Sequence, residues 1–438
     1  MDVSTPHLPD GRRTNGLRTN GLRTNGLRLD GTRLDNIDLV RGLVMVLMLL
    51  DHTRDFVHAT GQFENPMNLA TTTPWLYATR WVTHLCAPAF VWLAGTSVGL
   101  QWLRSSGDPA ARRALAGYLR RRGAWLIVAE LLLVRPLMYF NVDPSYAAGL
   151  QVIWAIGVGL LLLSVVLSLP MRVVGAFGLV VIAGHNLLDG LTVAPWFPPS
   201  TEAVSWGARL WMTVHQGGLF PLGAWPSPVV FAMYPLLPWL GVLCAGYGFA
   251  ELYTLPAARR RSLLLWVTLA MVVVFLALRL THGYGDPIPW RGQDSAGRTI
   301  MSFMNVQKYG PSLQFVLITL APSFLLLALT DGSRARGLGA ALVTFGRVPM
   351  FYYLLQWVWA HLAGMTVTAI HGGDLGFFFL NPVQQIVAMS AGRTFTVGGS
   401  LTEVYIAWAL GVVLLYWPCR WYAALKARRP DLPLLRYL

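Results

Sequence analysis

Long apolar stretches recur from residue 37 almost to the end of the chain, and they constrain the fold more than any other feature. A helix of about 18 to 25 residues crosses the hydrocarbon core of a bilayer while satisfying its own backbone hydrogen bonds. Hydrophobic residues make up 55% of the 438 residues and charged residues only 12%, which is too apolar for a soluble protein of this length. The sequence therefore predicts an all-α, polytopic membrane protein with about ten transmembrane helices. The predicted spans cover residues 37–57, 79–103, 121–140, 148–168, 172–192, 228–252, 262–282, 312–330, 340–370 and 402–425.

The chain is expected to have three parts. Residues 1–36 contain the repeated motif LRTNG, a polar, Gly-rich and Arg-rich tract that cannot bury enough surface to fold. We expect them to form a disordered cytoplasmic tail. Residues 37–425 form the transmembrane domain, and residues 426–438 form a short cytoplasmic tail.

Two stretches within the membrane domain call for special treatment. Residues 340–370 are too long for one span, and we expect a break near Gly364. The Pro-rich and Trp-rich segment 195–228 predicts an outer loop with an interfacial helix around residues 204–214, where tryptophans can lie at headgroup level.

The basic residues predict the orientation of the chain. The net charge is +14, but Lys and Arg lie between the apolar runs and do not form a patch with exposed aromatics, which excludes a nucleic-acid interface. With the N-terminus inside, the inner segments hold 23 Lys and Arg and the outer loops five. Short cytoplasmic segments carry such an excess. We therefore expect both termini in the cytoplasm of an integral membrane protein, located in the inner membrane if the cell is bacterial.

The first predicted helix carries several ionisable side chains, which are costly inside a membrane and indicate function by default. Asp38 and Arg41 lie toward its cytoplasmic end, and Asp51 and His52 toward its outer end. Arg41 and His52 are eleven residues apart, so they lie within roughly 20° of one helix face and about 16 Å apart along the axis. This separation is close to the reach of a phosphopantetheine arm.

These positions favour a site for acyl transfer. Arg41, with Asp38 beside it, can hold the phosphates of a donor at the inner mouth, while the thioester carbonyl lies beside His52. Imidazole acts as a general base or a nucleophile near neutral pH, and Asp51 can orient it. The alternative is that Asp38, Arg41 and Asp51 only form ion pairs between helices, with His52 a hydrogen-bonded core histidine.

Other polar residues extend this hypothesis. His84 in the second helix is expected at the depth of His52, so the two histidines can converge on one catalytic site. Gly95 and the small residues after it favour close helix packing. For Glu130 we favour a buried ion pair over a proton relay. Two positions near the outer ends of helices, Asn305 and Lys308, can contact an extracytoplasmic acceptor or merely anchor helices.

The remaining histidines and the cysteines are assigned more simply. His185 lies at the outer end of the fifth predicted helix, where it is a further candidate for acceptor binding or for anchoring a helix. His215 is expected in an outer loop and receives no role. No histidine spacing compels a metal site, so no metal is predicted, and one remains possible only through tertiary convergence. The three cysteines, Cys86, Cys244 and Cys419, are predicted to be core residues. Nucleotide-binding and soluble hydrolase motifs are missing.

Seven segments in order are distinctive: RLDNIDLVRGLVMVLMLLDHTRDF, RWVTHLCAPAFVWLAGTS, LQVIWAIGVGLLLLS, GHNLLDG, YPLLPWLGVLCAGYGFA, NVQKYGPS and FGRVPMFYYLLQWVWAHLAG. Together they resemble the bacterial membrane proteins of the heparan-alpha-glucosaminide N-acetyltransferase catalytic-domain family, and the resemblance covers about residues 33–425. The opening RLDNIDLVRG, with a histidine eleven residues after its arginine, also resembles the wider transmembrane acyltransferase group that includes acyltransferase family 3.

The resemblance implies a multi-helix enzyme that takes acetyl-CoA from the cytoplasm and acetylates a sugar or another acceptor on the far side of the membrane with a membrane histidine. By position, Arg41 and His52 match the arginine and histidine of the wider group. Two residues depart from the family pattern. Gln356 stands where relatives often have histidine, and Gly310 where they often have proline.

The leading hypothesis is therefore an acyl-CoA-dependent transmembrane acyltransferase, in the lipid bilayer and with a homodimer as one option. Its expected acceptor is a cell-envelope glycan or another extracytoplasmic molecule. The alternative is a proton-coupled secondary transporter or lipid flippase in which Asp51, His52 and Glu130 relay protons. Transporters of that kind often contain inverted repeats, and the sequence shows no convincing repeat.

Overall fold

The computed structural model describes residues 35–105, 108–429, 431–432, 435 and 437. The predicted N-terminal tail lies outside the described residues, except for Asp35 and Asn36, which begin the first helix. Much of the predicted C-terminal tail also lies outside them. The last described helix ends at Arg428, three residues beyond the predicted span.

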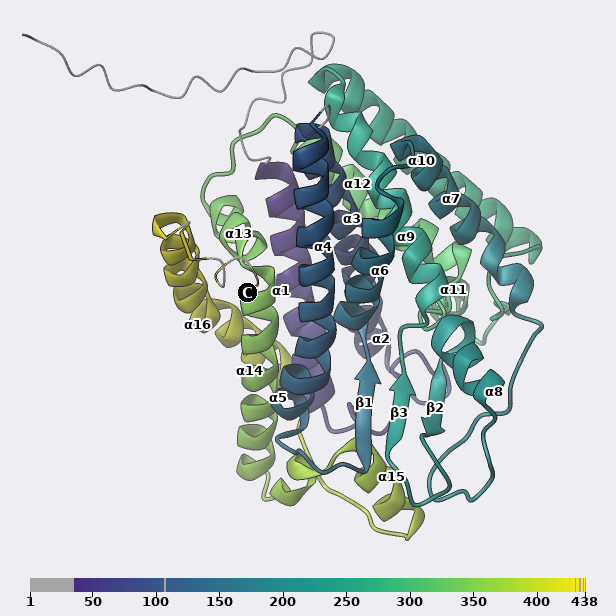
Figure 1. The fold of residues 1–438 in the computed structure, drawn as a ribbon. Helices are drawn as coiled ribbons and strands as arrows, with labels where there is room; N and C mark the ends of the chain where they lie inside the picture. Colours follow the sequence, from purple (N-terminus) through teal and green to yellow (C-terminus); the bar gives the residue numbers. More distant parts are fainter. Residues whose placement is uncertain (1–34, 106–107, 430, 433–434, 436, 438) are drawn as a thin grey trace, which may run out of the picture. The chain divides into compact units, whose positions relative to one another are not determined.

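The described chain is mostly helical, with one small sheet (Figure 1). The α-helices are α1 (Asp35–Val57), α2 (Pro74–Thr83), α3 (Cys86–Arg104), α4 (Pro109–Ala129), α5 (Arg135–Tyr139), α6 (Val152–Val166), α7 (Met171–Gly184), α8 (Trp206–Trp211), α9 (Leu236–Phe249), α10 (Ala257–Thr281), α11 (Ala296–Met304), α12 (Leu313–Leu329), α13 (Leu338–Arg347), α14 (Pro349–Ile370), α15 (Pro382–Ser390) and α16 (Leu401–Arg428). The strands are β1 (Tyr146–Leu150), β2 (Gly218–Pro221) and β3 (Val229–Ala232). Short 3-10 or π segments are η1 (Glu130–Val134), η2 (His185–Leu188), η3 (Met212–Gln216), η4 (Ala250–Thr254) and η5 (Leu375–Phe379).

Five helical runs in the described chain are long and apolar enough to cross a membrane, and a bent pair makes a sixth. The five are Pro74–Arg104, Met171–Leu188, Leu236–Thr254, Ala257–Thr281 and Leu401–Arg428. Each of the ten predicted stretches contains a helix, but α6 and α12 have only 15 and 17 residues, and α1 carries too many charges. The count of ten spans therefore stays a prediction.

The break in the bent pair was predicted at the wrong place. α13 and α14 meet at 97°, and the break lies at Val348, not near Gly364. Val348 precedes Pro349, whose ring disfavours a helical backbone in the preceding residue. Gly364 instead lies within α14 where it touches α1. A Cβ there would come 2.5 Å from the Phe56 carbonyl oxygen.

The sheet corrects the prediction of a purely helical protein. Its strands follow the order β1-β3-β2 (Figure 1), with β1 parallel and β2 antiparallel to β3. β1 and β3 occupy the beginnings of two predicted spans, 148–168 and 228–252. Prolines on both sides of β3 keep helix α9 from beginning earlier. A helix predicted around residues 204–214 is present as α8, which continues into the π-helical turn η3; its position at the membrane interface stays a prediction.

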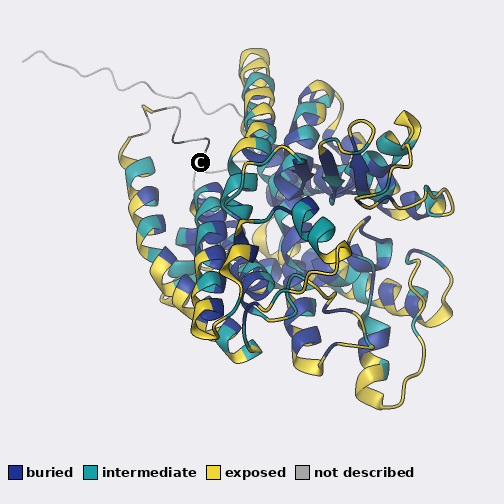
Figure 2. Ribbon diagram, turned by 90° about the horizontal axis from the view of Figure 1, so that it is seen from below, coloured by how far each residue is buried: buried dark blue, intermediate teal, exposed yellow. Residues whose placement is uncertain are grey.

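The core of the bundle surrounds α1, which packs against α3, α13, α14 and α16. Small residues permit the closest approaches. A Cβ on Gly42 would lie 1.8 Å from the Leu342 carbonyl oxygen, and one on Gly346 would lie 1.9 Å from that of Asp38. The predicted packing role of Gly95 is confirmed, because its Cβ would lie 2.0 Å from the Leu243 carbonyl oxygen of α9. Figure 2 shows buried residues on the inner sides of the packed helices and exposed residues on the outer sides.

Candidate functional site

A buried carboxylate, Asp51 near the outer end of α1, gathers three cationic side chains. Nη1 of Arg80 from α2 lies 2.6 and 2.7 Å from its two oxygens. Arg54 lies 3.2 Å away and the Lys308 ammonium 3.7 Å away. The Thr83 hydroxyl donates to Asp51 over 2.6 Å. Residues from α1, α2 and the loop before α12 therefore converge on one carboxylate.

The cations outnumber the carboxylates at this point. Arg54 also pairs with Asp55, its neighbour in sequence, so three cationic groups share two acidic ones. Truncation of one partner of a buried ion pair leaves the other charge uncompensated, which is strongly destabilising. We therefore expect this cluster of charged side chains to be rigid. Its formal charge is positive, and a positive cluster stabilises negative charge that forms on a molecule nearby.

His52 lies next to this group but its ring turns elsewhere. The imidazole stacks on Trp357 of α14 with 3.7 Å between centroids and packs edge-on against Tyr353. Its Nδ1 is buried and has no hydrogen-bond partner in the described chain. Asp51, which was expected to orient it, binds Arg80 and Thr83 instead. Stacking on Trp357 is thus the contact that fixes the ring.

A cavity opens in front of His52 and Asp51. It encloses about 400 Å³ of empty space, open solvent at its mouth included. Polar and apolar side chains from six segments of the chain line it. The lining residues are Met48, Asp51, His52, Cys86, Ala87, Phe90, Gln151, Val152, Tyr234, Lys308 and Tyr353.

The inner end of α1 holds Arg41 at a junction of three helices. Its guanidinium donates to Asp38 over 2.9 Å, to the Gly346 carbonyl over 3.2 Å and to the Ser97 hydroxyl over 2.8 Å. Arg347, whose side chain is 43% exposed, lies 3.8 Å from Asp38. Since α1 is continuous from Asp35 to Val57, Arg41 and His52 lie about 16 Å apart along its axis.

The other predicted catalytic residue, His84, lies between α2 and α3 and is 2% exposed. Its ring packs edge-on against Phe315, and its Nδ1 has no partner among the described residues. It does not line the cavity. The residue before it, Thr83, donates to Asp51.

The three residues predicted to bind the acceptor lie at different places in the structure. Only Lys308 lines the cavity. Asn305 donates its side-chain amide to the Met67 carbonyl over 3.3 Å, and its own carbonyl accepts from Arg279 over 2.8 Å. His185 lies elsewhere, at the end of α7.

Asp286 holds the loop that carries Lys308. Its carboxylate accepts from the Gln307 amide over 2.8 Å and from the Ser312 hydroxyl over 2.6 Å. Burial raises the pKa of Asp286, while the hydrogen bonds from Ser312 and Gln307 lower it. Both ends of the loop are therefore fixed, and Lys308 is presented to Asp51 from a rigid base.

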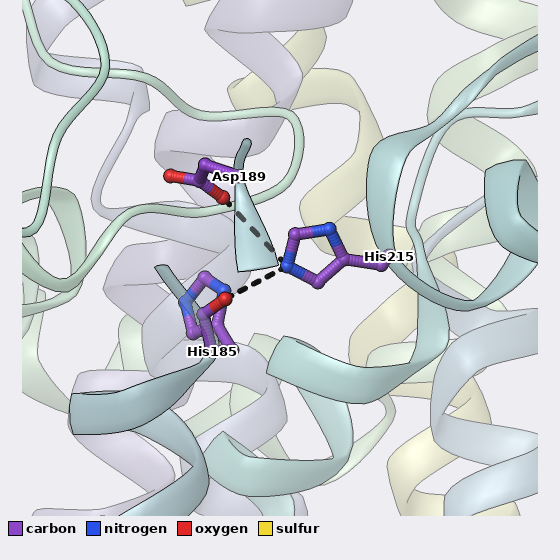
Figure 3. A group of neighbouring side chains, drawn as sticks. All are labelled: His185, Asp189 and His215. Carbon is purple, nitrogen blue, oxygen red and sulfur yellow. Dashed lines mark hydrogen bonds and ion pairs between the residues drawn. The ribbon is translucent and has the colours of Figure 1, made fainter. Parts of the chain in front are cut away.

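A second polar cluster joins His185 to Asp189 and His215. The possible ligand atoms of the three side chains all lie within 4.8 Å of one another. Figure 3 shows the Nε2 of His215 pointing toward both Asp189 and the His185 carbonyl, at 3.7 and 3.0 Å. His215 had no predicted role, because nothing in the sequence places an outer-loop histidine beside the end of α7.

Several residues in or beside the cavity were missed by sequence reasoning. Arg80 is a charged residue within the predicted second span, so the cost of burying it was an available signal. Tyr353, Trp357 and Tyr234 carry no such signal, because aromatic residues in an apolar span usually serve as packing.

Comparison with known families gives one match. The family model described as Heparan-alpha-glucosaminide N-acetyltransferase, catalytic, matches residues 33–280. Comparison with curated proteins gives no match. The matched segment contains Arg41, Asp51, His52 and Arg80, while Lys308 and the aromatic residues of α14 lie beyond it.

Proposed function

The chain belongs to the heparan-alpha-glucosaminide N-acetyltransferase catalytic family, and we therefore propose that it transfers an acetyl group within the cavity at His52. The family implies a membrane acetyltransferase. The observation that carries the proposal for this chain is the cavity itself, where an imidazole, a lysine and two tyrosines surround one space inside the helical bundle.

His52 is the proposed general base. The nitrogen or oxygen of the acceptor bonds to the thioester carbonyl carbon, and His52 takes the proton that the acceptor loses. When the C–S bond breaks, the thiol of CoA leaves with the proton returned from His52. General base catalysis of this kind contributes about 10²- to 10⁴-fold to a rate.

Lys308 is the proposed stabiliser of the oxyanion. The carbonyl oxygen of the thioester becomes negative when the acceptor attacks, and fixed positive groups stabilise that charge in a site sheltered from water. The ammonium of Lys308 lines the cavity, and its loop is fixed by Asp286. Asp51 then has a supporting role, since it positions Lys308 and Arg80 and does not orient His52.

Acetyl-CoA is the proposed donor, entering from the cytoplasmic side. Arg41, beside Asp38, marks the inner end of the route about 16 Å from His52, which suits a phosphopantetheine arm with its phosphates at Arg41. Arg347 is a further phosphate contact, because it is more exposed than Arg41 and shares Asp38 with it.

The acceptor is proposed to be an amine or hydroxyl of a sugar on the other side of the membrane. A terminal glucosaminide is the first compound to test, because the name of the family includes it. His84, predicted as a catalytic residue, and Asn305, predicted as an acceptor contact, do not line the cavity, so a role for either in the reaction stays a prediction.

The first experiment measures donor binding by the full chain in detergent. Acetyl-CoA is titrated by calorimetry into wild type and Arg41→Ala, with desulfo-CoA as a second ligand. The proposal expects saturable binding that weakens in Arg41→Ala. Failure of the wild type to bind any acyl-CoA contradicts the proposal.

The second experiment separates binding from chemistry. His52→Ala should bind acetyl-CoA as wild type does and lose about 10²- to 10⁴-fold in the release of free CoA with a glucosaminide acceptor. The matched control is His58→Ala, six residues further along the chain, where the ring contacts Thr60. Equal rates in His52→Ala and wild type would remove His52 from the mechanism.

Proton-coupled transport remains the second candidate because α13 and α14 form a broken helix, a feature that transporters use near their binding sites. Proteoliposomes distinguish the two functions. An acetyltransferase releases CoA in proportion to acetylated acceptor, whereas a transporter moves its solute unchanged and dissipates a proton gradient.

A further inference from the structure

We propose that His185, Asp189 and His215 form a binding site for a divalent first-row metal ion, with Zn²⁺ the best match. The site lies outside the cavity at His52 and goes beyond the acetyl transfer proposed above. Its three residues come from the end of α7, the turn that follows η2 and the π-helical segment η3.

The side chains have the spacing that a metal ion needs. Bonds of about 2.0–2.2 Å in a tetrahedral site place neighbouring ligand atoms about 3.4 Å apart. Nε2 of His215 lies 3.7 Å from Oδ1 of Asp189, and all possible ligand atoms lie within 4.8 Å of one another. Small rotations of the side chains close the remaining difference.

The surroundings of His185 support a metal site independently of the spacing of the side chains. It is 4% exposed, and neither of its ring nitrogens has a hydrogen-bond partner in the described chain. The Pro311 carbonyl approaches the ring without completing a hydrogen bond. Buried polar groups are almost always paired, and a neutral imidazole is the commonest metal ligand in proteins. A metal ion satisfies one nitrogen and leaves the other for a nearby carbonyl.

Neighbouring side chains fix the orientation of Asp189 and His215. Asn186 donates to Oδ2 of Asp189 over 2.8 Å, which leaves Oδ1 toward His215. The ring of His215 stacks on Trp211 at 4.8 Å. Hydrogen bonds that orient the ligands are a regular part of metal sites, and π-helical turns such as η3 often occur at functional sites.

The ligand set favours a transition metal over Ca²⁺ or Mg²⁺. Two imidazoles and one carboxylate suit Zn²⁺ and its neighbours in the first row, while Ca²⁺ and Mg²⁺ prefer oxygen ligands throughout. The Asp189 side chain is 28% exposed, so a hydrated ion has a route of entry. Three protein ligands leave a fourth position for water.

Metal binding would also change the tautomer of His215. In the described geometry Nε2 of His215 lies 3.0 Å from the His185 carbonyl, which fits an N–H that donates to this oxygen. This proton must move to Nδ1 before Nε2 can coordinate an ion, because a neutral imidazole coordinates through its unprotonated nitrogen.

The test uses the full chain, purified with an affinity tag free of histidine and stripped of metal with a chelator. Zn²⁺ is supplied at buffered free concentrations, and bound zinc per chain is measured by mass spectrometry. Co²⁺ replaces Zn²⁺ in a parallel sample, whose visible absorption reports a four-coordinate site. We expect one ion per chain and a rise in thermal stability when it binds.

Variants identify the ligands. His185→Ala, His215→Ala and Asp189→Asn should each weaken zinc binding by at least about 100-fold, and Asn186→Ala by about 10- to 100-fold. His371→Ala is the matched control, because this histidine also pairs with a carboxylate, that of Glu403 at 2.8 Å. It should leave the affinity unchanged.

Two outcomes overturn the proposal. One is wild type without stoichiometric zinc and without a four-coordinate cobalt spectrum. The other is equal zinc affinity in wild type, Asp189→Asn and Asn186→Ala. Asp189→Asn and Asn186→Ala keep the test decisive if a histidine variant does not fold, since Asp189→Asn preserves the size of the side chain and Asn186→Ala reduces it.

Discussion

Helices α1 and α10 are both long enough to cross a bilayer, with 23 and 25 residues, yet they differ in how much of their surface is buried. Most residues of α1 are buried, including Asp38, Asp51 and Arg54. In α10 only Leu264, Phe275 and Arg279 are buried, and the remaining surface is suited to lipid. The comparison shows that apolar composition identifies helices that face lipid. A buried helix with several charged side chains, such as α1, is not recognised as a membrane span by composition.

The charges of the two helices differ in the same way. Asp51 of α1 meets three cationic side chains, whereas Arg279 near the end of α10 has one carboxylate, that of Asp286 at 3.7 Å, and otherwise binds mainly backbone carbonyls. Its guanidinium donates to the carbonyls of Ile288, Ser302, Phe303 and Asn305. The charged group around Asp51 lies beside a cavity. The guanidinium of Arg279 instead holds a loop in its folded conformation.

The largest effect on stability is expected from Arg80→Ala. This change leaves Asp51 without its nearest cation and should lower the free energy of unfolding by about 3–5 kcal/mol. Chemical unfolding in detergent micelles measures it. Arg80→Lys retains the charge and should recover part of the loss. If Arg80→Ala is as stable as wild type, the polar core around α1 has no structural role.

Phe275→Ala tests the few inward positions of α10. Phe275 is 1% exposed, and its removal should destabilise the protein by about 3 kcal/mol because a buried cavity is left. Leu276, the next residue, is 40% exposed, so Leu276→Ala should change stability by about 0.5 kcal/mol or less. Similar effects of the two changes in thermal unfolding would refute the assignment of a lipid face.

Gly346→Ala tests the close approach of α13 to α1. The added Cβ would lie 1.9 Å from the Asp38 carbonyl oxygen, so the helices must separate, at a cost of about 1–3 kcal/mol. Gly297 of α11 has no atom within 4 Å of its Cβ position. Gly297→Ala should therefore stabilise by about 0.4–1 kcal/mol. The comparison fails if both variants unfold at the same denaturant concentration.

Arg172→Ala should have the smallest effect. Arg172 pairs with Glu251 over 2.7 Å, but its side chain is 86% exposed. Exposed ion pairs contribute little to stability, and raising the salt concentration should remove even this small difference. A loss comparable to that of Arg80→Ala would show that exposure does not separate the two kinds of ion pair.

Much of the helical framework could be predicted because apolar length is a strong signal, and the start of α1 lies within two residues of its predicted position. Local backbone rules explain the errors. Val348 before Pro349 was the available sign of a break, while Gly364 looked like one but serves close packing. Short strands such as β1 and β3 are indistinguishable from the ends of apolar helices by composition alone.

The site was predictable in part. A charged or titratable residue within an apolar span stands out, and this signal leads to Asp51 and His52. Their contacts do not follow from it, because Trp357, which stacks on His52, and Lys308, which lines the cavity, lie more than 250 residues further along the chain. The cluster of His185 with His215 depends on tertiary convergence in the same way.

The position of α1 has a consequence for how the protein is made. Its neighbours α13, α14 and α16 belong to the last part of the chain, and Trp408 of α16 donates to the Val46 carbonyl of α1 over 2.9 Å. At the outer end, the amide of Ala59 donates to the Gly399 carbonyl. Since α1 leaves the ribosome long before α16, this side of α1 stays uncovered until α16 has been made. During synthesis, the insertion machinery has to shelter α1 from lipid until α16 arrives.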